Sequence, residues 1–198
     1  MTPDELSSAL RAHARWSATA GREGEKLKLV SADLRGVDLT GTDLVEAELF
    51  DVDLRGARLD GVAAGGIWLS GSRLEDASAI GLQAAKANLV EITAARIVLR
   101  GACLHRTDMM RVDLRDADLS DCDLSETMLT NAMLQGACLR NATIDGASLA
   151  DSDMSGTDVD GLRGIDTATL DGVVLDDRGP LSRKEALDSL RARGAMDE

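Results

Sequence analysis

An apolar residue recurs every five residues from Leu29 to Val159 without a slip in register. This period matches neither the 3.6-residue turn of an α-helix nor the alternation of a β-strand, so neither element explains it. The residue two positions earlier is nearly always small or apolar, and the residue between the two is commonly Asp, as in Ala32-Asp33-Leu34. The 27 central residues are Leu29, Leu34, Leu39, Leu44, Leu49, Leu54, Leu59, Ala64, Leu69, Leu74, Ala79, Ala84, Leu89, Ala94, Leu99, Leu104, Met109, Leu114, Leu119, Leu124, Leu129, Leu134, Leu139, Ile144, Leu149, Met154 and Val159.

A coil with corners explains a period of five. If each unit forms one side of a square, the central residue and the small residue two before it both point inward, and the other three face water or turn the corner. Four units then close a turn of about 20 residues, and successive turns stack about 4.8 Å apart. The pattern therefore predicts that residue n lies beside residue n + 20 in a rod of nearly seven turns, about 35 Å long.

The repeated motif resembles that of the pentapeptide-repeat family, roughly Ala-Asp/Asn-Leu-x-x, over about 130 residues. The resemblance implies an all-β solenoid, a right-handed quadrilateral β-helix, whose hand does not follow from the spacing alone. Between Gly61 and Ile97 the phase is kept although several central residues shrink to alanine, so we expect a thinner core and an uninterrupted coil. These alanines are Ala64, Ala79, Ala84 and Ala94.

Both ends of the chain depart from the repeat. Thr2, Pro3 and Glu5 have the pattern of a capping box and predict a helix that ends near Gly21 and covers the first coil. After Val159 the phase breaks and resumes one residue late, which indicates a bulge or a looser corner, and a second capping box follows Pro180. The predicted division is 1–26 for the N-terminal capping helix and lead-in, 27–161 for the repeats, 162–179 for the out-of-phase final repeats, and 180–198 for the C-terminal helix and tail.

Composition fits a single domain with a narrow core, because 44% of the residues are hydrophobic. The sequence has no apolar run long enough to span a bilayer and no charged-then-apolar leader, so we expect no membrane span, no secretion signal and a cytoplasmic protein. The register places Cys103 over Asp123 and Cys138 over Asp118, which predicts no disulfide pair among the three cysteines.

Features of catalytic sites are scarce in this sequence. His13 lies on the apolar side of the predicted helix, and His105 follows a central residue beside Arg106, whose charge would weaken it as a base. We find no phosphate-binding glycine loop, metal-spaced cluster or nucleophile elbow, and the glycines fall at corners. The sequence therefore predicts a noncatalytic protein without a cofactor or metal.

Charge is unevenly distributed along the chain, whose net charge is −13. Eight acidic and three basic residues lie in 31–61, five and seven in 73–115, and ten and one in 116–160. This balance, with few aromatic residues, argues against direct binding of nucleic acid. We call the central arginines the basic waist: Arg96, Arg100, Arg106, Arg111 and Arg115.

Two explanations of the acidic residues remain open. They keep a repetitive rod soluble, or they present a charge pattern like that of duplex DNA to a partner. The resemblance favours the second explanation, because relatives that confer resistance to quinolones or to gyrase poisons are dimeric, DNA-like rods that bind type II topoisomerases such as DNA gyrase. This chain lacks the loop between coils on which protection depends in some of them. The candidate acidic face is Asp33, Asp53, Asp113, Asp118, Asp123, Asp153 and Asp158.

The same relatives join through their C-terminal ends. We therefore expect a homodimer through Leu181, Leu187 and Leu190, with capping of the last coil of the same chain as the alternative.

A scaffold protein that binds an unidentified partner through the flat solenoid faces is the second function the sequence allows. Its candidate contacts are Trp68, Met128 and Met133, which occupy the normally polar outer position.

Overall fold

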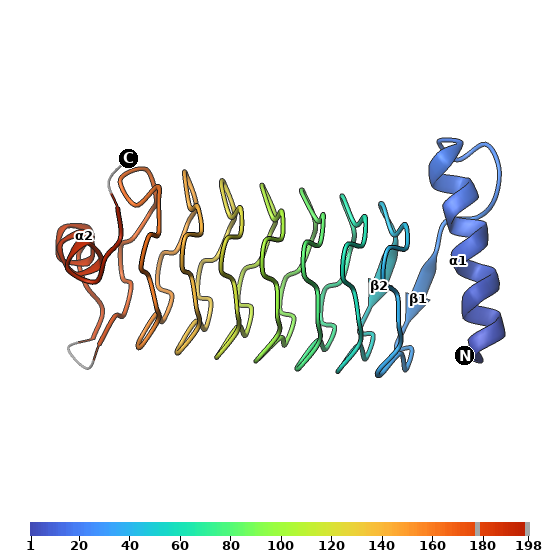
Figure 1. Ribbon diagram of the computed structural model, residues 1–198, viewed down its shortest axis with the longest axis horizontal. Coiled ribbons are helices and arrows are strands. Elements are labelled where there is room, and N and C mark those ends of the chain that lie inside the picture. Colours follow the sequence, from blue (N-terminus) through green and yellow to red (C-terminus); the bar gives the residue numbers. More distant parts are fainter. Residues whose placement is uncertain (177–178, 197–198) are drawn as a thin grey trace.

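The protein is a rod of stacked coils with one helix across each end (Figure 1). The computed structural model describes residues 1–176 and 179–196. Parts of the predicted segments 162–179 and 180–198, namely residues 177–178 and 197–198, lie outside the described residues. The elements are α1 (Pro3–Ala18), β1 (Lys28–Val30), β2 (Glu48–Phe50) and α2 (Arg183–Ala192).

Neighbouring coils are joined in parallel register, with residue n beside residue n + 20. Strand β1 pairs with β2, and isolated bridges continue the same pairing along the rod. In each bridge a central residue donates its N–H to the next coil, as Leu34 does to the Asp53 carbonyl at 2.8 Å, and Asp53 N–H donates back to Ala32 at 2.9 Å. This confirms the predicted stacking. We name the four columns of bridging residues after their first members in the first full coil: Asp33, Asp38, Asp43 and Glu48.

The central residues form the core of the rod. All of them are buried except Leu29, which lies in β1 at the open end of the stack and is only partly buried. One continuous inward column shows the packing along the axis: Leu34, Leu54, Leu74, Ala94, Leu114, Leu134 and Met154, each at most 6% exposed.

The alanine-rich stretch keeps its register, as predicted, because its bridges still join residue n to residue n + 20. The core there is thinned only in part. Three alanine centres follow a larger inward residue two positions earlier, so one bulky side chain per unit is retained, and the remaining void is about 20 Å³. The three combinations are Val62 with Ala64, Leu82 with Ala84, and Ile92 with Ala94.

The corners have left-handed backbone at the residue two after each central residue. Glycine occupies many of these positions, for example Gly101 with φ of +67°. Charged residues, Asn and one Ser occupy the others, for example Arg96 at +60° and Asp121 at +60°. The coil geometry therefore imposes the left-handed conformation whether or not glycine is present.

The predicted one-residue slip occurs between two successive bridges near the C-terminal end. Thr143 pairs with Arg163 at the usual spacing, whereas Ser148 pairs with Thr169, one position later than that spacing would give. Gly164, with φ of +84°, begins an extra turn in which it accepts a hydrogen bond from Ala168 N–H at 3.2 Å.

Helix α1 lies at the predicted end of the rod, but it ends at Ala18 and not near Gly21, and it covers only part of the first coil. Its capping box joins Thr2 and Glu5 in both directions. Its inward side chains include Leu6 and fully buried His13, whose Nδ1 accepts a hydrogen bond from Leu27 N–H at 3.0 Å. Helix α2 covers the opposite end and also begins with a capping box, between Ser182 and Glu185.

Candidate functional site

The most concentrated charge on the rod lies in residues 116–160, which we call the acidic segment. It carries ten acidic residues and one basic residue. At about 4.8 Å of rise per 20-residue coil, it occupies about 11 Å of the rod. Ion pairs join Asp118 to Arg100 at 2.7 Å and Glu126 to Arg106 at 2.7 Å, so two arginines of the basic waist reach into this segment.

Most of the acidic segment is not neutralised by such contacts. A third ion pair joins Asp158 to Arg140 at 2.7 Å. The other carboxylates have no ion pair among the described residues, and they occupy three corners, two bridge positions and two positions after central residues. Their columns differ, so negative charge surrounds the rod. They are Asp116, Asp121, Asp123, Asp145, Asp151, Asp153 and Asp160.

The seven residues of the candidate acidic face lie in three different columns. Asp118 and Asp158 belong to the Asp38 column, with Cys138 between them, and Asp123 belongs to the Asp43 column. The four residues in the Asp33 column are Asp33, Asp53, Asp113 and Asp153. The structure therefore distributes these residues around the rod and does not gather them on one side.

Asp113 differs most from the expectation that these carboxylates face water. The residue is only 6% exposed, because the Arg115 guanidinium lies over it at 2.6 Å. The hydrogen bond from that guanidinium lowers the pKa of Asp113, and the same arrangement with Arg35 lowers the pKa of exposed Asp33 to about 2. Asp53 repeats it with Arg55 at 2.5 Å. These three carboxylates are thus paired within the chain and contribute little net charge to the surface.

The acidic face predicted from the sequence does not include the carboxylates at the corners. Asp116, Asp121 and Asp151 have φ between 57° and 60°. Their position could have identified them as exposed, because they lie two residues after a central residue, where the repeats of this chain have glycine or a polar residue. Asp tolerates the left-handed region better than most residues, because its short polar side chain bonds locally.

The basic waist is not a free cationic patch. Each of its arginines forms an ion pair, four with a residue one coil away and one with a residue two positions earlier. The pairs are Arg96 with Asp76 at 2.6 Å, Arg100 with Asp118 at 2.7 Å, Arg106 with Glu126 at 2.7 Å, Arg111 with Glu91 at 2.7 Å, and Arg115 with Asp113 at 2.6 Å.

The outer apolar residues named from the sequence are exposed, as expected. Trp68 is 46% exposed and Met128 43% exposed, and both lie in the Glu48 column. Phe50 in β2 adds a ring 6.2 Å from that of Trp68. Asn88 and Asp108 separate Trp68 from Met128 within the column, and Met133 lies in the Asp33 column, so the three residues named from the sequence do not form one continuous surface.

The three leucines predicted as dimer contacts are buried by their own chain. Leu181, Leu187 and Leu190 are 7%, 8% and 0% exposed and belong to the main hydrophobic core. Helix α2 thus covers the last coil, which is the alternative that the sequence left open.

Other functional features are few in the part of the chain that the structure describes. It contains no cluster of three or more His, Cys, Asp or Glu residues placed to hold a metal ion. Within the same residues, no helix is sufficiently long and apolar to cross a membrane.

Comparison with solved structures identifies a fluoroquinolone resistance protein and pentapeptide repeat proteins. Full-length QnrB1, a plasmid-mediated fluoroquinolone resistance protein, is 19% identical, with a TM-score of 0.46 over 82% of this chain and 86% of its own. A pentapeptide repeat protein from the Arabidopsis thaliana thylakoid lumen is 19% identical, with a TM-score of 0.39 over 75% and 71%. HetL from the cyanobacterium Nostoc sp. strain PCC 7120 is 23% identical, with a TM-score of 0.26 over 91% and 100%.

The family comparison rests on the repeats themselves. No curated protein sequence matches the chain. A family model described as "Pentapeptide repeats" matches eight copies in residues 28–62, 81–116 and 107–146, just over half of the sequence. Repeats of this kind form right-handed β-helices, in agreement with the 20-residue stacking. The chain belongs to the pentapeptide-repeat family.

Proposed function

We propose that this chain is a noncatalytic, cytoplasmic binding protein with a quadrilateral cross-section. Its acidic segment imitates duplex DNA and occupies the DNA-binding channel of DNA gyrase or a related type II topoisomerase. Occupation of the channel modulates the enzyme or protects it from poisons, and so confers resistance to an antibiotic.

The linear charge density of the acidic segment carries this proposal. Ten acidic residues against Arg140, Arg100 and Arg106 leave a net charge of −7 over about 11 Å of rod. This is about one net charge per 1.5 Å, and B-DNA carries one per about 1.7 Å. A channel that attracts duplex DNA by its charge would therefore attract this segment with similar strength.

The placement of the charges supports the same function. DNA is negative around its whole circumference, and the unpaired carboxylates likewise occupy several columns and corners of the rod. Because they lack ion pairs among the described residues, a basic channel gains their full charge when it binds.

A matched pair of triple variants tests the proposal. The test variant combines Asp116→Asn, Asp121→Asn and Asp151→Asn, and Asn tolerates the left-handed backbone at these corners. The control combines Glu46→Gln, Asp51→Asn and Asp108→Asn, which removes three charges outside the acidic segment. We expect the test variant to bind purified gyrase at least about tenfold more weakly than the control, because binding depends on local charge.

Salt and competing DNA provide the second measurement. Wild-type binding to gyrase should fall steeply with ionic strength and compete with duplex DNA, and the bound protein should alter supercoiling or poison-stabilised cleavage. Replacing Arg100 and Arg106 by Ala should preserve binding, since it removes positive charge. The absence of any effect on gyrase and its decatenating relative would refute the proposal.

We also propose that the rod forms a homodimer through its C-terminal end. Leu187 is only 8% exposed and Leu190 is fully buried. The dimer interface would therefore also use the outer surface of α2. Analytical ultracentrifugation should give a dimer at tens of micromolar. A monomer at that concentration would refute the dimer.

A scaffold function is the second candidate, and the exposed apolar pair of Phe50 and Trp68, with Met128 three coils further along the Glu48 column, favours it. If the protein binds a partner in this way, Trp68→Ser should abolish capture of that partner while leaving binding to gyrase unaffected. Loss of partner capture in the charge-neutralised triple variant instead would argue against a contact through Trp68.

A further inference from the structure

At the N-terminal edge of the first coil, the backbone is hydrogen-bonded to a preceding segment in only one of the four columns. In the second coil, Asp53 and Arg58 donate their N–H groups to the first coil at 2.9 Å and accept hydrogen bonds from it through their carbonyls at 2.8 Å. In the Glu48 column, β1 satisfies the equivalent groups of the first coil. In the other columns, the equivalent residues are Asp33, Asp38 and Asp43, and their backbone N–H and C=O groups have no hydrogen-bond partner among the described residues.

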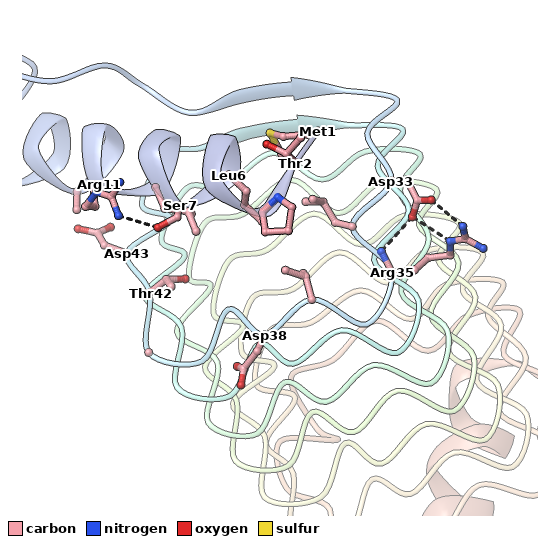
Figure 2. Close-up of a pocket in the computed structure, with 16 residues that line it drawn as sticks. Met1, Thr2, Leu6, Ser7, Arg11, Asp33, Arg35, Asp38, Thr42 and Asp43 are labelled. Atoms are coloured by element: carbon pink, nitrogen blue, oxygen red, sulfur yellow. Dashed lines mark hydrogen bonds and ion pairs between the residues drawn. The ribbon is translucent and has the colours of Figure 1, made fainter.

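Helix α1 does not replace the missing coil over these residues. It lies across the end of the rod beside β1, and a groove of about 820 Å³ remains between the helix and the open edge (Figure 2). In Figure 2 the rim passes from Asp33 and Arg35 through Asp38 to Asp43. The apolar lining comes from the helix and from the core side of the coil: Met1, Pro3, Leu6, Leu10, Leu34 and Val37.

The open edge specifies how a ligand backbone would pair with it. By the register of the coils, Asp33 and Asp38 direct both backbone groups away from the second coil and into the space where a preceding coil would lie. An extended segment there would pair in parallel, giving N–H groups to these carbonyls and carbonyls to these N–H groups, with one repeat of the pattern every five residues.

The carboxylate charge at the open edge favours a basic side chain in the ligand. Asp33 is paired with Arg35 of its own coil at 2.7 Å, so the carboxylate that selects a ligand charge is that of Asp38, whose side chain is 58% exposed. Asp38 already pairs with Arg58, stacked one coil later in the same column, at 3.1 Å. A basic residue stacked one coil earlier would reach the same carboxylate from the open side.

We propose that this edge binds an extended peptide segment of a partner protein, in which an apolar residue recurs every five positions and the one in the Asp38 column is preceded directly by Arg or Lys. The segment completes the missing coil along the Asp33 and Asp38 columns. Its apolar side chains cover Leu34 and Val37, and its basic residue in the Asp38 column stacks on the Asp38 carboxylate. This interaction is separate from the proposed function of the acidic segment.

A synthetic peptide with the sequence Gly-Ala-Arg-Leu-Thr-Gly-Ala-Arg-Leu-Thr-Gly, capped at both ends and labelled with fluorescein, tests this proposal with the full-length chain. Fluorescence anisotropy should show saturable binding below about 1 mM. N-methylation of the two leucine amides, which removes the N–H groups that donate to Asp33 and Asp38, should weaken binding at least about tenfold.

Two protein variants test the position of the site. Asp38→Lys should weaken binding of the Arg peptide at least about tenfold and should bind a peptide with Asp in place of both Arg residues better than wild type does. Asp108→Lys is the control, because Asp108 has the same place in its repeat and also accepts a hydrogen bond from the residue two later, but lies between two coils.

Each outcome decides the proposal. Weakening by Asp38→Lys alone, together with the effect of N-methylation, supports it. No saturable binding below about 1 mM, or equal weakening by both protein variants, overturns it. Self-association of the wild-type chain that the Asp38→Lys substitution abolishes would also overturn it, because the occupant would then be a second copy.

Discussion

Replacing Leu114 by alanine tests whether the core is held at a fixed coil spacing. Leu114 is fully buried between Ala94 and Leu134 in its inward column. Deleting three carbon atoms removes about 2.4 kcal/mol of burial energy, at about 0.8 kcal/mol for each. The cavity adds about 1–2 kcal/mol where the surroundings do not relax.

Relaxation is restricted here because the backbone is bonded to both neighbouring coils. Leu114 N–H donates to Met133 at 2.8 Å, and Ala94 N–H donates to Asp113 at 2.8 Å. We therefore expect Leu114→Ala to lower the free energy of unfolding by about 4 kcal/mol. Leu29→Ala is the matched control, and we expect it to lower that energy by only about 1 kcal/mol, because Leu29 is partly exposed at the end of the stack.

Urea unfolding followed by circular dichroism measures both changes, and the slopes with denaturant show whether the rod still unfolds as one unit. A loss below about 2 kcal/mol for Leu114→Ala would show that the coils collapse onto the cavity. Equal losses for the two variants would contradict the assignment of Leu29 to the open end of the core.

Three further predictions concern the corners and two buried groups. Gly101→Ala should lower stability by about 1 kcal/mol through its left-handed backbone alone, since a Cβ there meets nothing within 4 Å, whereas Gly164→Ala should cost clearly more in urea unfolding, because a Cβ there would lie 2.5 Å from a backbone nitrogen. Burial lowers the pKa of His13 below 6.5 in the fold. The unfolded chain therefore binds more protons as the pH falls, so stability should decrease from about pH 6.5 downwards, and His13→Gln should remove this dependence in unfolding titrations. Burial raises the pKa of the Cys122 thiol to about 12, so iodoacetamide at about pH 8 should alkylate the other two cysteines of the native protein first, as mass spectrometry would show; early modification of Cys122 would contradict its burial.

The repeat itself was predictable because one period specifies both the inward positions and their neighbours. The same reasoning located the slip after Val159 and the capping box at Thr2, where local chemistry determines the structure. The pairing partners of the arginines were less accessible. Arg96 has an acidic corner residue one coil away in each direction, Asp76 and Asp116, and it pairs with Asp76 through a choice of side-chain rotamer that spacing does not reveal.

The burial of Asp113 and the open N-terminal edge have a similar origin. Spacing places Asp113 on the outside, but the conformation of Arg115 decides whether water reaches the carboxylate. The capping box predicts that a helix begins at the end of the rod, yet the direction in which α1 crosses the coil depends on packing of residues such as Leu6 and His13. Local patterns therefore identified the elements, and long side chains determined much of the candidate site.

The hydrogen bonds between coils run along the axis of the rod, and this direction determines how the protein responds to force. When the two ends are pulled apart, the load falls on the few bonds of the terminal coil, so the solenoid peels open one turn at a time and does not shear as a block. Each turn of about 20 residues releases about 65 Å of extended chain in place of about 4.8 Å of rod. When the molecule is stretched by its ends, the chain should therefore lengthen in equal steps, one for each turn that unfolds.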